Sequence, residues 1–258
     1  MAWILITGCL LSVWVISLCK VLLLAHMCKR NSFKKNGKAL RKRNVLIVIA
    51  HPDDESMFFT PTINYLISRG HYIYILCLSI GDADNRGRIR KRELFQACAT
   101  LKVPMQQVKV VDHPDLQDGF GKVWNHKLVA NLVKEEIGKY NIDMIITFDN
   151  YGVSGHCNHR DVYYGVCELL YDIPHREIEA WELVSTNILR KYIGPIDVWL
   201  SVFVAMLHSN ETIQFLVNEH PCRSFLAMAQ HSSQWVWFRK CFVAMSSYTY
   251  MNTLRKIK

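Results

Sequence analysis

The chain has 258 residues, and half of them are hydrophobic, which suffices for one domain with a sizeable core and a short appendage. Its formal net charge of +9 first suggests a nucleic acid or an anionic membrane surface as a partner. The excess charge is confined to Lys20 and the segment 29–43, however, and the chain from Asn44 onward is close to neutral. Because the body lacks a basic stripe, the sequence predicts no nucleic-acid partner.

A long apolar segment precedes this body. Residues 2–19 contain no charged side chain, and the apolar character continues over 21–25, after Lys20. A run of about 18 or more apolar residues is long enough to cross a bilayer. We therefore expect residues 1–28 to form a transmembrane anchor. A cleaved signal peptide is the alternative, which is disfavoured because no basic residue precedes the run and no small-residue cleavage motif follows it.

The basic segment 29–43 follows the predicted span directly, and we expect it to form a juxtamembrane linker. Positively charged flanks stay on the cytoplasmic side of a membrane, so the sequence predicts a single-pass protein whose body faces the cytosol. The nine cysteines agree, because they are scattered and form no CxxC pair, as in proteins of reducing compartments. Cys28, beside the span, offers an acylation site, although an inert cysteine is the simpler interpretation.

The body alternates short apolar runs with amphipathic stretches. Strands that are apolar throughout and alternate with helices are typical of a parallel sheet covered on both faces. We therefore predict a Rossmann-like α/β domain over residues 44–258, with a mostly parallel sheet and helices on both faces. Strands are expected at 44–50, 71–80, 108–112 and 142–149, and helices at 56–70, 88–103, 123–140 and 159–171.

The last part of the chain is less regular. Residues 177–185 have the pattern of a further strand. The segment Ile193–Leu207 is apolar, but Pro195 and Asp197 interrupt it, and it is too short for a secure second span. We expect this segment to be buried in the core, with an element that dips into the membrane interface as the alternative. Residues 234–245 interleave aromatic and basic side chains, a composition also found at membrane surfaces.

Titratable residues follow two of the predicted strands, as AHPDDE at 50–55 and GHCNHRD at 155–161. Ligands of open parallel sheets bind outside the carboxyl ends of the strands, where both motifs are expected. Adjacent acids are costly to desolvate unless a cation compensates them, although they also suit a helix N-terminus. One imidazole and one carboxylate from the first motif, with an imidazole from the second, form a three-ligand set typical of catalytic zinc.

The two motifs together resemble the LmbE-like zinc de-N-acetylase family, over about residues 44–171. The predicted anchor and the stretches 48–59, 153–161 and 187–195 are similar to the branch of this family that acts on N-acetylglucosaminyl-phosphatidylinositol. This resemblance implies a metal-dependent hydrolase that removes acetate from that glycolipid to give glucosaminyl-phosphatidylinositol, an early step of GPI-anchor biosynthesis. It also implies an endoplasmic-reticulum membrane protein with its catalytic domain in the cytosol.

The resemblance assigns roles to individual residues. His51, Asp54 and His159 match the metal ligands, and Asp53 matches the general base. His156 matches the group that polarises the amide carbonyl or protonates the leaving amine. The expected metal is Zn²⁺, although two histidines and an aspartate also accept other divalent first-row ions.

Several neighbouring residues have less specific expectations. Bacterial members of the family commonly carry an aspartate where this chain has Asn158, which favours an oxyanion donor over a charged acid at His156. Glu55 is expected to cap or orient the loop rather than to take part in catalysis. Arg88 and Arg90 belong to a basic stretch that is expected to be mostly solvated, but either guanidinium matches the geometry of a substrate phosphate.

Two other functions remain open from the sequence. The chain is either a de-N-acetylase of another glycoconjugate or an inactive, membrane-bound adaptor. The presence of all three expected ligands, the base and the second histidine disfavours the adaptor. Neither a protein partner nor an oligomeric state is predicted.

Overall fold

A computed structural model describes residues 1–32, 41–173, 178–207 and 212–257. Its centre is a seven-stranded sheet in the order β3-β2-β1-β4-β5-β7-β6, in which the first five strands are parallel and β7 and β6 are antiparallel additions. The predicted Rossmann-like class, a mostly parallel sheet, is therefore confirmed. The strands are β1 Asn44–Ile49, β2 Tyr72–Cys77, β3 Val108–Val110, β4 Met144–Phe148, β5 Glu179–Leu183, β6 Ile213–Val217 and β7 Met251–Lys256.

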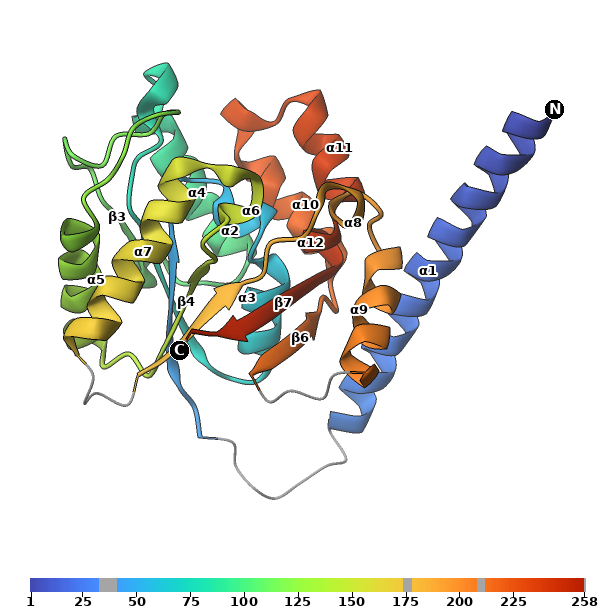
Figure 1. Cartoon of the computed structure of the whole chain (residues 1–258), viewed down its shortest axis with the longest axis horizontal. Helices are drawn as coiled ribbons and strands as arrows, with labels where there is room; N and C mark the ends of the chain where they lie inside the picture. The colour runs from blue at the N-terminus through green and yellow to red at the C-terminus, as the bar shows by residue number, and fades with distance from the viewer. Residues whose placement is uncertain (33–40, 174–177, 208–211, 258) are drawn as a thin grey trace.

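Helices cover both faces of this sheet, which explains why the central strands are apolar throughout. On one face α3 packs against β2 and α4 against β3, while α10 packs on α4; on the other face α5 and α7 pack together against β1 (Figure 1). All of β1 from Val45 onward is buried. The helices are α1 Ala2–Ser32, α2 Asp54–Met57, α3 Thr60–Ser68, α4 Gly87–Thr100, α5 His126–Tyr140, α6 Gly152–Gly155, α7 Cys157–Asp172, α8 Ile188–Lys191, α9 Ile196–Leu207, α10 Pro221–Gln230, α11 Trp237–Met245 and α12 Ser247–Tyr250.

The predicted helix over 56–70 is divided into α2 and α3. Pro61 lies in the first turn of α3, where its missing N–H is tolerated, but it cannot continue a helix that begins upstream. The predicted helix over 123–140 begins only at His126, because the Asn125 side chain accepts a hydrogen bond from the Leu128 N–H and caps it there. Conversely, α7 starts at Cys157, earlier than predicted.

Helix α1 contains the stretch Trp3–Leu23, which is long and apolar enough to cross a membrane and is mostly exposed. Its later part packs against α9, the helix within Ile193–Leu207. Core burial was predicted for that segment, and this is correct for one face only: Val198 is buried, whereas Leu200 and Phe203 are exposed. The side chains of Cys28 and of the basic positions 29–38 lie outside the described residues.

Candidate active site

The two titratable motifs meet at one edge of the sheet. β1 and β4 are parallel neighbours, and the chain continues from them toward opposite ends of the sheet. This arrangement leaves a crevice outside the carboxyl ends of both strands, where open α/β sheets bind ligands. Nitrogen atoms of His51, His156 and His159 lie there within 4.8 Å of one another.

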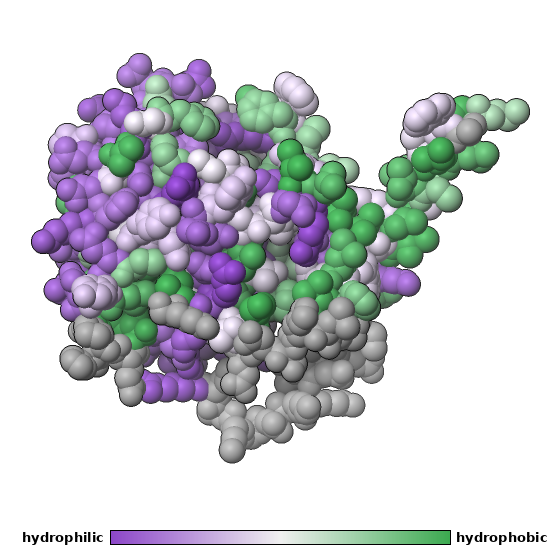
Figure 2. Space-filling view, viewed as in Figure 1, coloured by the Kyte–Doolittle hydropathy of each residue, from purple (hydrophilic) through white to green (hydrophobic). Residues whose placement is uncertain are grey.

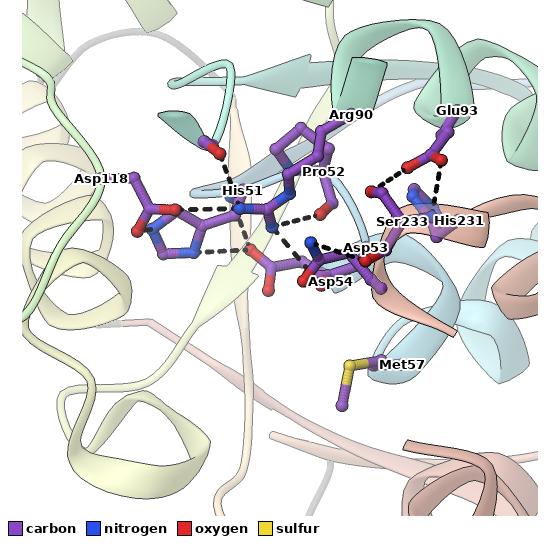
Figure 3. Close-up of polar contacts among 12 residues, drawn as sticks. His51, Pro52, Asp53, Asp54, Met57, Arg90, Glu93, Asp118, His231 and Ser233 are labelled. Atoms are coloured by element: carbon purple, nitrogen blue, oxygen red, sulfur yellow. Dashed lines mark hydrogen bonds and ion pairs between the residues drawn. The ribbon is translucent and has the colours of Figure 1, made fainter. Parts of the chain in front are cut away.

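Two of these histidines turn a ring nitrogen toward Asp54. His159 Nε2 is 3.2 Å from Asp54 Oδ1, and His51 Nδ1 is 3.8 Å from Asp54 Oδ2. The opposite nitrogens have partners of their own, because His51 Nε2 lies 3.0 Å from Asp118 Oδ1 and His159 Nδ1 lies 3.1 Å from the Gly152 carbonyl oxygen. Figure 3 shows the His51 ring between Asp118 and Asp54. Metal-binding histidines commonly have such outer partners, which fix the tautomer and the ring orientation.

The donor set fits a divalent metal. Burial alone would raise the pKa of Asp54, but the His159 and His51 rings beside it hold this pKa below its ordinary value, so the carboxyl is ionised. Two imidazoles and one carboxylate are ligands that zinc accepts. His156 Nδ1 is buried and has no hydrogen-bond partner among the described residues. This nitrogen is therefore available to bind a ligand in the pocket.

His156 is neutral at physiological pH. Burial, with the neighbouring His51 and His159, lowers the pKa of His156 to about 4. Asn158 does not contact this ring: its Oδ1 is 3.1 Å from His51 Nε2, and its Nδ2 donates to the Lys122 carbonyl. The amide at Asn158 therefore orients a predicted ligand and has no direct influence on His156, which differs from the expectation from sequence.

Asp53 and Asp54 point in different directions although they are adjacent. Asp53 has φ 116°, a strained value for a residue other than glycine. Its carboxylate lines the same cavity as the three histidines and pairs with Arg239 and, at 3.4 Å, with Arg90. The strained turn thus separates two neighbouring carboxylates and gives each its own surroundings.

Glu55 stabilises this turn through hydrogen bonds of its buried carboxylate. It is fully buried, and it accepts hydrogen bonds from the Asp53 N–H at 3.1 Å, the Ser56 hydroxyl at 2.6 Å and His231 Nε2 at 2.7 Å. The orienting role expected for Glu55 agrees with these contacts. Nothing in the sequence around His231 pointed to the site, because that residue follows α10 and has no motif beside it.

Arg90 ties three loops together rather than facing open space. Its guanidinium donates to the carbonyl oxygens of Pro52 and Gly81 at 2.8 Å each and to Asp118 Oδ2 at 3.0 Å, which joins the loops after β1, β2 and β3 (Figure 3). Arg88 lines a different cavity, beside Asp82 and Asp112. Contact of either arginine with a substrate phosphate stays a prediction. Asp118 was not identified from the sequence.

The loop before His156 is also strained. Gly152 has φ 66°, and a Cβ there would lie 2.8 Å from the His159 Cβ, so only glycine fits. Val153 has φ 65°, which is unusual for a β-branched residue. The Ser185 hydroxyl accepts from the Val153 N–H at 2.8 Å, and Lys191 Nζ donates to its carbonyl at 2.6 Å. The surrounding structure therefore holds this loop in one conformation.

A cavity of about 530 Å³ is lined by the titratable residues of the site, among them His51, Asp53, Asp54, His156 and His159. The C-terminal part of the chain closes one side of it with Tyr192, Phe238 and Phe242, and with Arg239, whose side chain is 21% exposed. A cavity with an apolar wall and convergent polar groups has the usual form of a small-molecule site.

Comparison with known proteins agrees with this geometry. The family model described as "PIG-L: GlcNAc-PI de-N-acetylase" matches residues 46–170. A protein of Schizosaccharomyces pombe named "Probable N-acetylglucosaminyl-phosphatidylinositol de-N-acetylase" is 36% identical over 247 residues, which covers 95% of this chain and 99% of that one. The chain belongs to the GlcNAc-PI de-N-acetylase family.

A second member of the GlcNAc-PI de-N-acetylase family, from Bos taurus, is 35% identical over 211 residues and covers 81% of each chain. Among solved structures, the N,N'-diacetylchitobiose deacetylase from Pyrococcus horikoshii superposes with a TM-score of 0.59, at 14% identity and with 84% of each chain covered. At that identity the likeness shows the fold alone. It extends the predicted LmbE-like architecture to most of the chain.

Proposed function

We propose that this chain is a zinc-dependent hydrolase that removes acetate from N-acetylglucosaminyl-phosphatidylinositol and leaves glucosaminyl-phosphatidylinositol, in GPI-anchor biosynthesis. The observation that carries the proposal is the pair of histidines, His51 and His159, that each turn one nitrogen toward Asp54 and bind an outer partner with the other. The names of the family relatives support the substrate.

His51, Asp54 and His159 would hold the zinc ion, as the family resemblance implies. A zinc ion held there would supply Lewis acidity and would lower the pKa of a bound water. The protein fixes the orientation of both imidazoles, because Asp118 contacts the His51 ring and the Gly152 carbonyl contacts the His159 ring.

Asp53 would transfer protons, and His156 would stabilise the negative charge that develops on the carbonyl oxygen. Asp53, whose carboxylate lines the same cavity as the proposed ligands without being one of them, would take a proton from the attacking water and later give it to the departing amine. Neutral His156 donates an N–H hydrogen bond to the carbonyl oxygen as negative charge develops there. Its low pKa favours this role over that of a charged acid.

Arg239 is the best-placed cation for the phosphate of the substrate. Its side chain is partly exposed at the cavity, whereas the Arg90 side chain is 8% exposed and already binds three loops. A guanidinium at this position can pair with a phosphodiester once Asp53 engages the reacting amide.

The same proposal covers location. We infer an anchor over residues 1–28, a linker over 29–43 and a catalytic domain over 44–258. The apolar helix stretch Trp3–Leu23 and the family relatives support attachment to the endoplasmic-reticulum membrane. The basic residues after this stretch favour a catalytic domain on the cytosolic side.

The test is acetate release from N-acetylglucosaminyl-phosphatidylinositol by the purified full chain, before and after chelation and after zinc is added back. His159→Ala should lose both bound zinc and activity, whereas His113→Ala, in the loop after β3, should keep both. Zinc binding without acetate release would direct the search to another glycoconjugate. A chain that binds no metal would support the adaptor instead.

A further inference from the structure

Exposed apolar side chains gather on α8, α9 and α11, beside the opening of the cavity. Leu189 is 77% exposed and Trp237 75%, values that are unfavourable for large apolar groups in water. Two members of the group, Tyr192 and Phe238, also line the cavity. We call this group the interfacial patch and define it as Ile188, Leu189, Tyr192, Phe203, Trp237 and Phe238.

Helix α1 sets the position of this patch relative to a bilayer. Val21 of α1 shares an apolar cluster with Val198 of α9, and Trp14 packs edge-on against Tyr250 at 6.2 Å. Trp14 and Val21 both lie in the second half of the stretch Trp3–Leu23. If that stretch crosses a hydrocarbon core of about 30 Å, Trp14 lies about 14 Å inside the boundary nearer the catalytic domain. The parts of α9 and α12 that pack against this half of α1 then lie inside the same boundary.

The other half of α1 indicates the direction of the membrane. It projects freely past the body, and α8 and α11 lie at the end of the body toward which it rises (Figure 1). In Figure 2 hydrophobic side chains run along α1 and continue over the adjoining face at α9. The exposed apolar surface of α1 and that of the domain are therefore continuous, and one bilayer can cover both.

We propose that the interfacial patch lies within the membrane leaflet next to the catalytic domain, so that the cavity opens onto the lipid headgroups. The glycolipid then enters the cavity laterally from the membrane. This route of entry rests on the proposed function, whereas the membrane contact itself rests on the packing of α1. Lys240 is exposed, and its Nζ lies 5.5 Å from the centre of the Trp235 ring. Such a combination of cationic and aromatic side chains is typical of the headgroup region of a membrane.

Photocrosslinking of the full chain in phosphatidylcholine vesicles tests the contact without any use of catalysis. Phe203 and Trp237 are each replaced by p-benzoylphenylalanine, and Tyr171, an exposed aromatic on α7, is the matched control. We expect radiolabelled lipid to attach at 203 and 237 severalfold more than at 171. Equal labelling at all three positions, or crosslinks to a second protein chain in place of lipid, would overturn the proposal.

A kinetic measurement separates this inference from the proposed function. Phe203→Glu with Trp237→Glu should raise KM severalfold for the long-chain glycolipid in vesicles and leave KM unchanged for a short-chain, water-soluble analogue, whereas Tyr171→Glu should change neither. Unchanged KM for both substrates would contradict the patch. If the crosslinker variants label lipid but the wild-type chain releases acetate from neither substrate, the proposed function is refuted and the patch stands.

Discussion

The parallel and the antiparallel parts of the sheet contribute to the cavity in different ways. The parallel part supplies the groups proposed to carry the chemistry, and each of them lies in the segment that follows β1 or β4, either in the loop or in the first turn of the next helix. The antiparallel part, with the helices between β6 and β7, supplies His231 and Arg239, which contact residues 176 and 186 positions away in the sequence. The comparison shows that the proposed reacting groups follow the ends of parallel strands, whereas the C-terminal part orients these groups and encloses the cavity.

The largest effect should come from the parallel part, at Asp53. We expect Asp53→Asn to lower kcat by about 10²–10⁴-fold, because an amide cannot take a proton from water. Zinc content should not change, because Asp53 pairs with Arg239 and Arg90 and is not one of the proposed ligands. The measurements are acetate release and metal analysis of the same sample. An active Asp53→Asn variant, with Asp115→Asn as the surface control, would remove the base from the proposed mechanism.

A matched pair of glycines tests the loop after β4. Gly152 and Gly155 both have positive φ, but an added Cβ meets His159 only at Gly152 and is in open space at Gly155. Gly152→Ala should therefore displace His159 and reduce both zinc affinity and activity strongly. Gly155→Ala should show only the cost of the left-handed backbone, about 1–2 kcal/mol of stability. Equal zinc affinity in the two variants would contradict the close approach.

His231 tests the contribution of the antiparallel part. His231→Phe leaves the Glu55 carboxylate buried without this partner, and we expect the free energy of unfolding to fall by about 3–5 kcal/mol. Activity should also fall, because Glu55 holds the Asp53 N–H, while zinc stays bound. His231→Gln retains a donor and should recover part of both. Thermal unfolding in detergent and acetate release measure the two effects, and an unchanged midpoint would show that the pair is dispensable.

The smallest effect is expected at the opposite edge of the parallel part. Burial, with Arg43 and Arg69, lowers the pKa of His71 below 6.5, and its Nδ1 accepts a hydrogen bond from the Arg43 N–H. The unfolded chain therefore binds this proton first, so the contribution of His71 to stability is complete above pH 6.5 and is lost as pH falls toward the folded pKa.

His71→Asn retains an acceptor that does not titrate. Between about pH 7.5 and about pH 5.5, wild-type chain should lose slightly more thermal stability than this variant, with activity at pH 7.5 unchanged in both. Equal losses across this range would show that His71 does not titrate in it. A loss of activity would contradict the separation between the two edges of the sheet.

The sequence predicted well wherever a local pattern carried the structure. The apolar run of β1 and its neighbours specified a parallel sheet, and the rule that ligands bind at strand ends placed the two motifs in one expected site. It predicted poorly where packing decided the outcome. The segment Ile193–Leu207 has the composition of a core helix, yet α9 buries only the face that packs against α1, α12 and β6 and leaves the other face exposed.

The residues missed by sequence reasoning share one property. Asp118 and His231 lie in segments without a motif, and the pattern around Arg239 indicated only a membrane surface; each of the three acts on the site through contacts with distant residues. A single side chain in such a segment carries no periodicity and no fixed spacing to its partner. The contact of Asn158 was missed for the same reason. Its position beside His159 in the sequence does not predict that its side chain contacts the His51 ring.

The sequence by itself determined the sheet class, the apolar N-terminal stretch and the meeting of two histidine- and acid-rich loops, because periodicity and strand order constrain these locally. Only the tertiary structure decided which way Asp53 points, which ring Asn158 orients and where α9 exposes its apolar face. Those outcomes depend on strained backbone and on hydrogen bonds between distant segments, and such contacts exist only after the whole chain has packed.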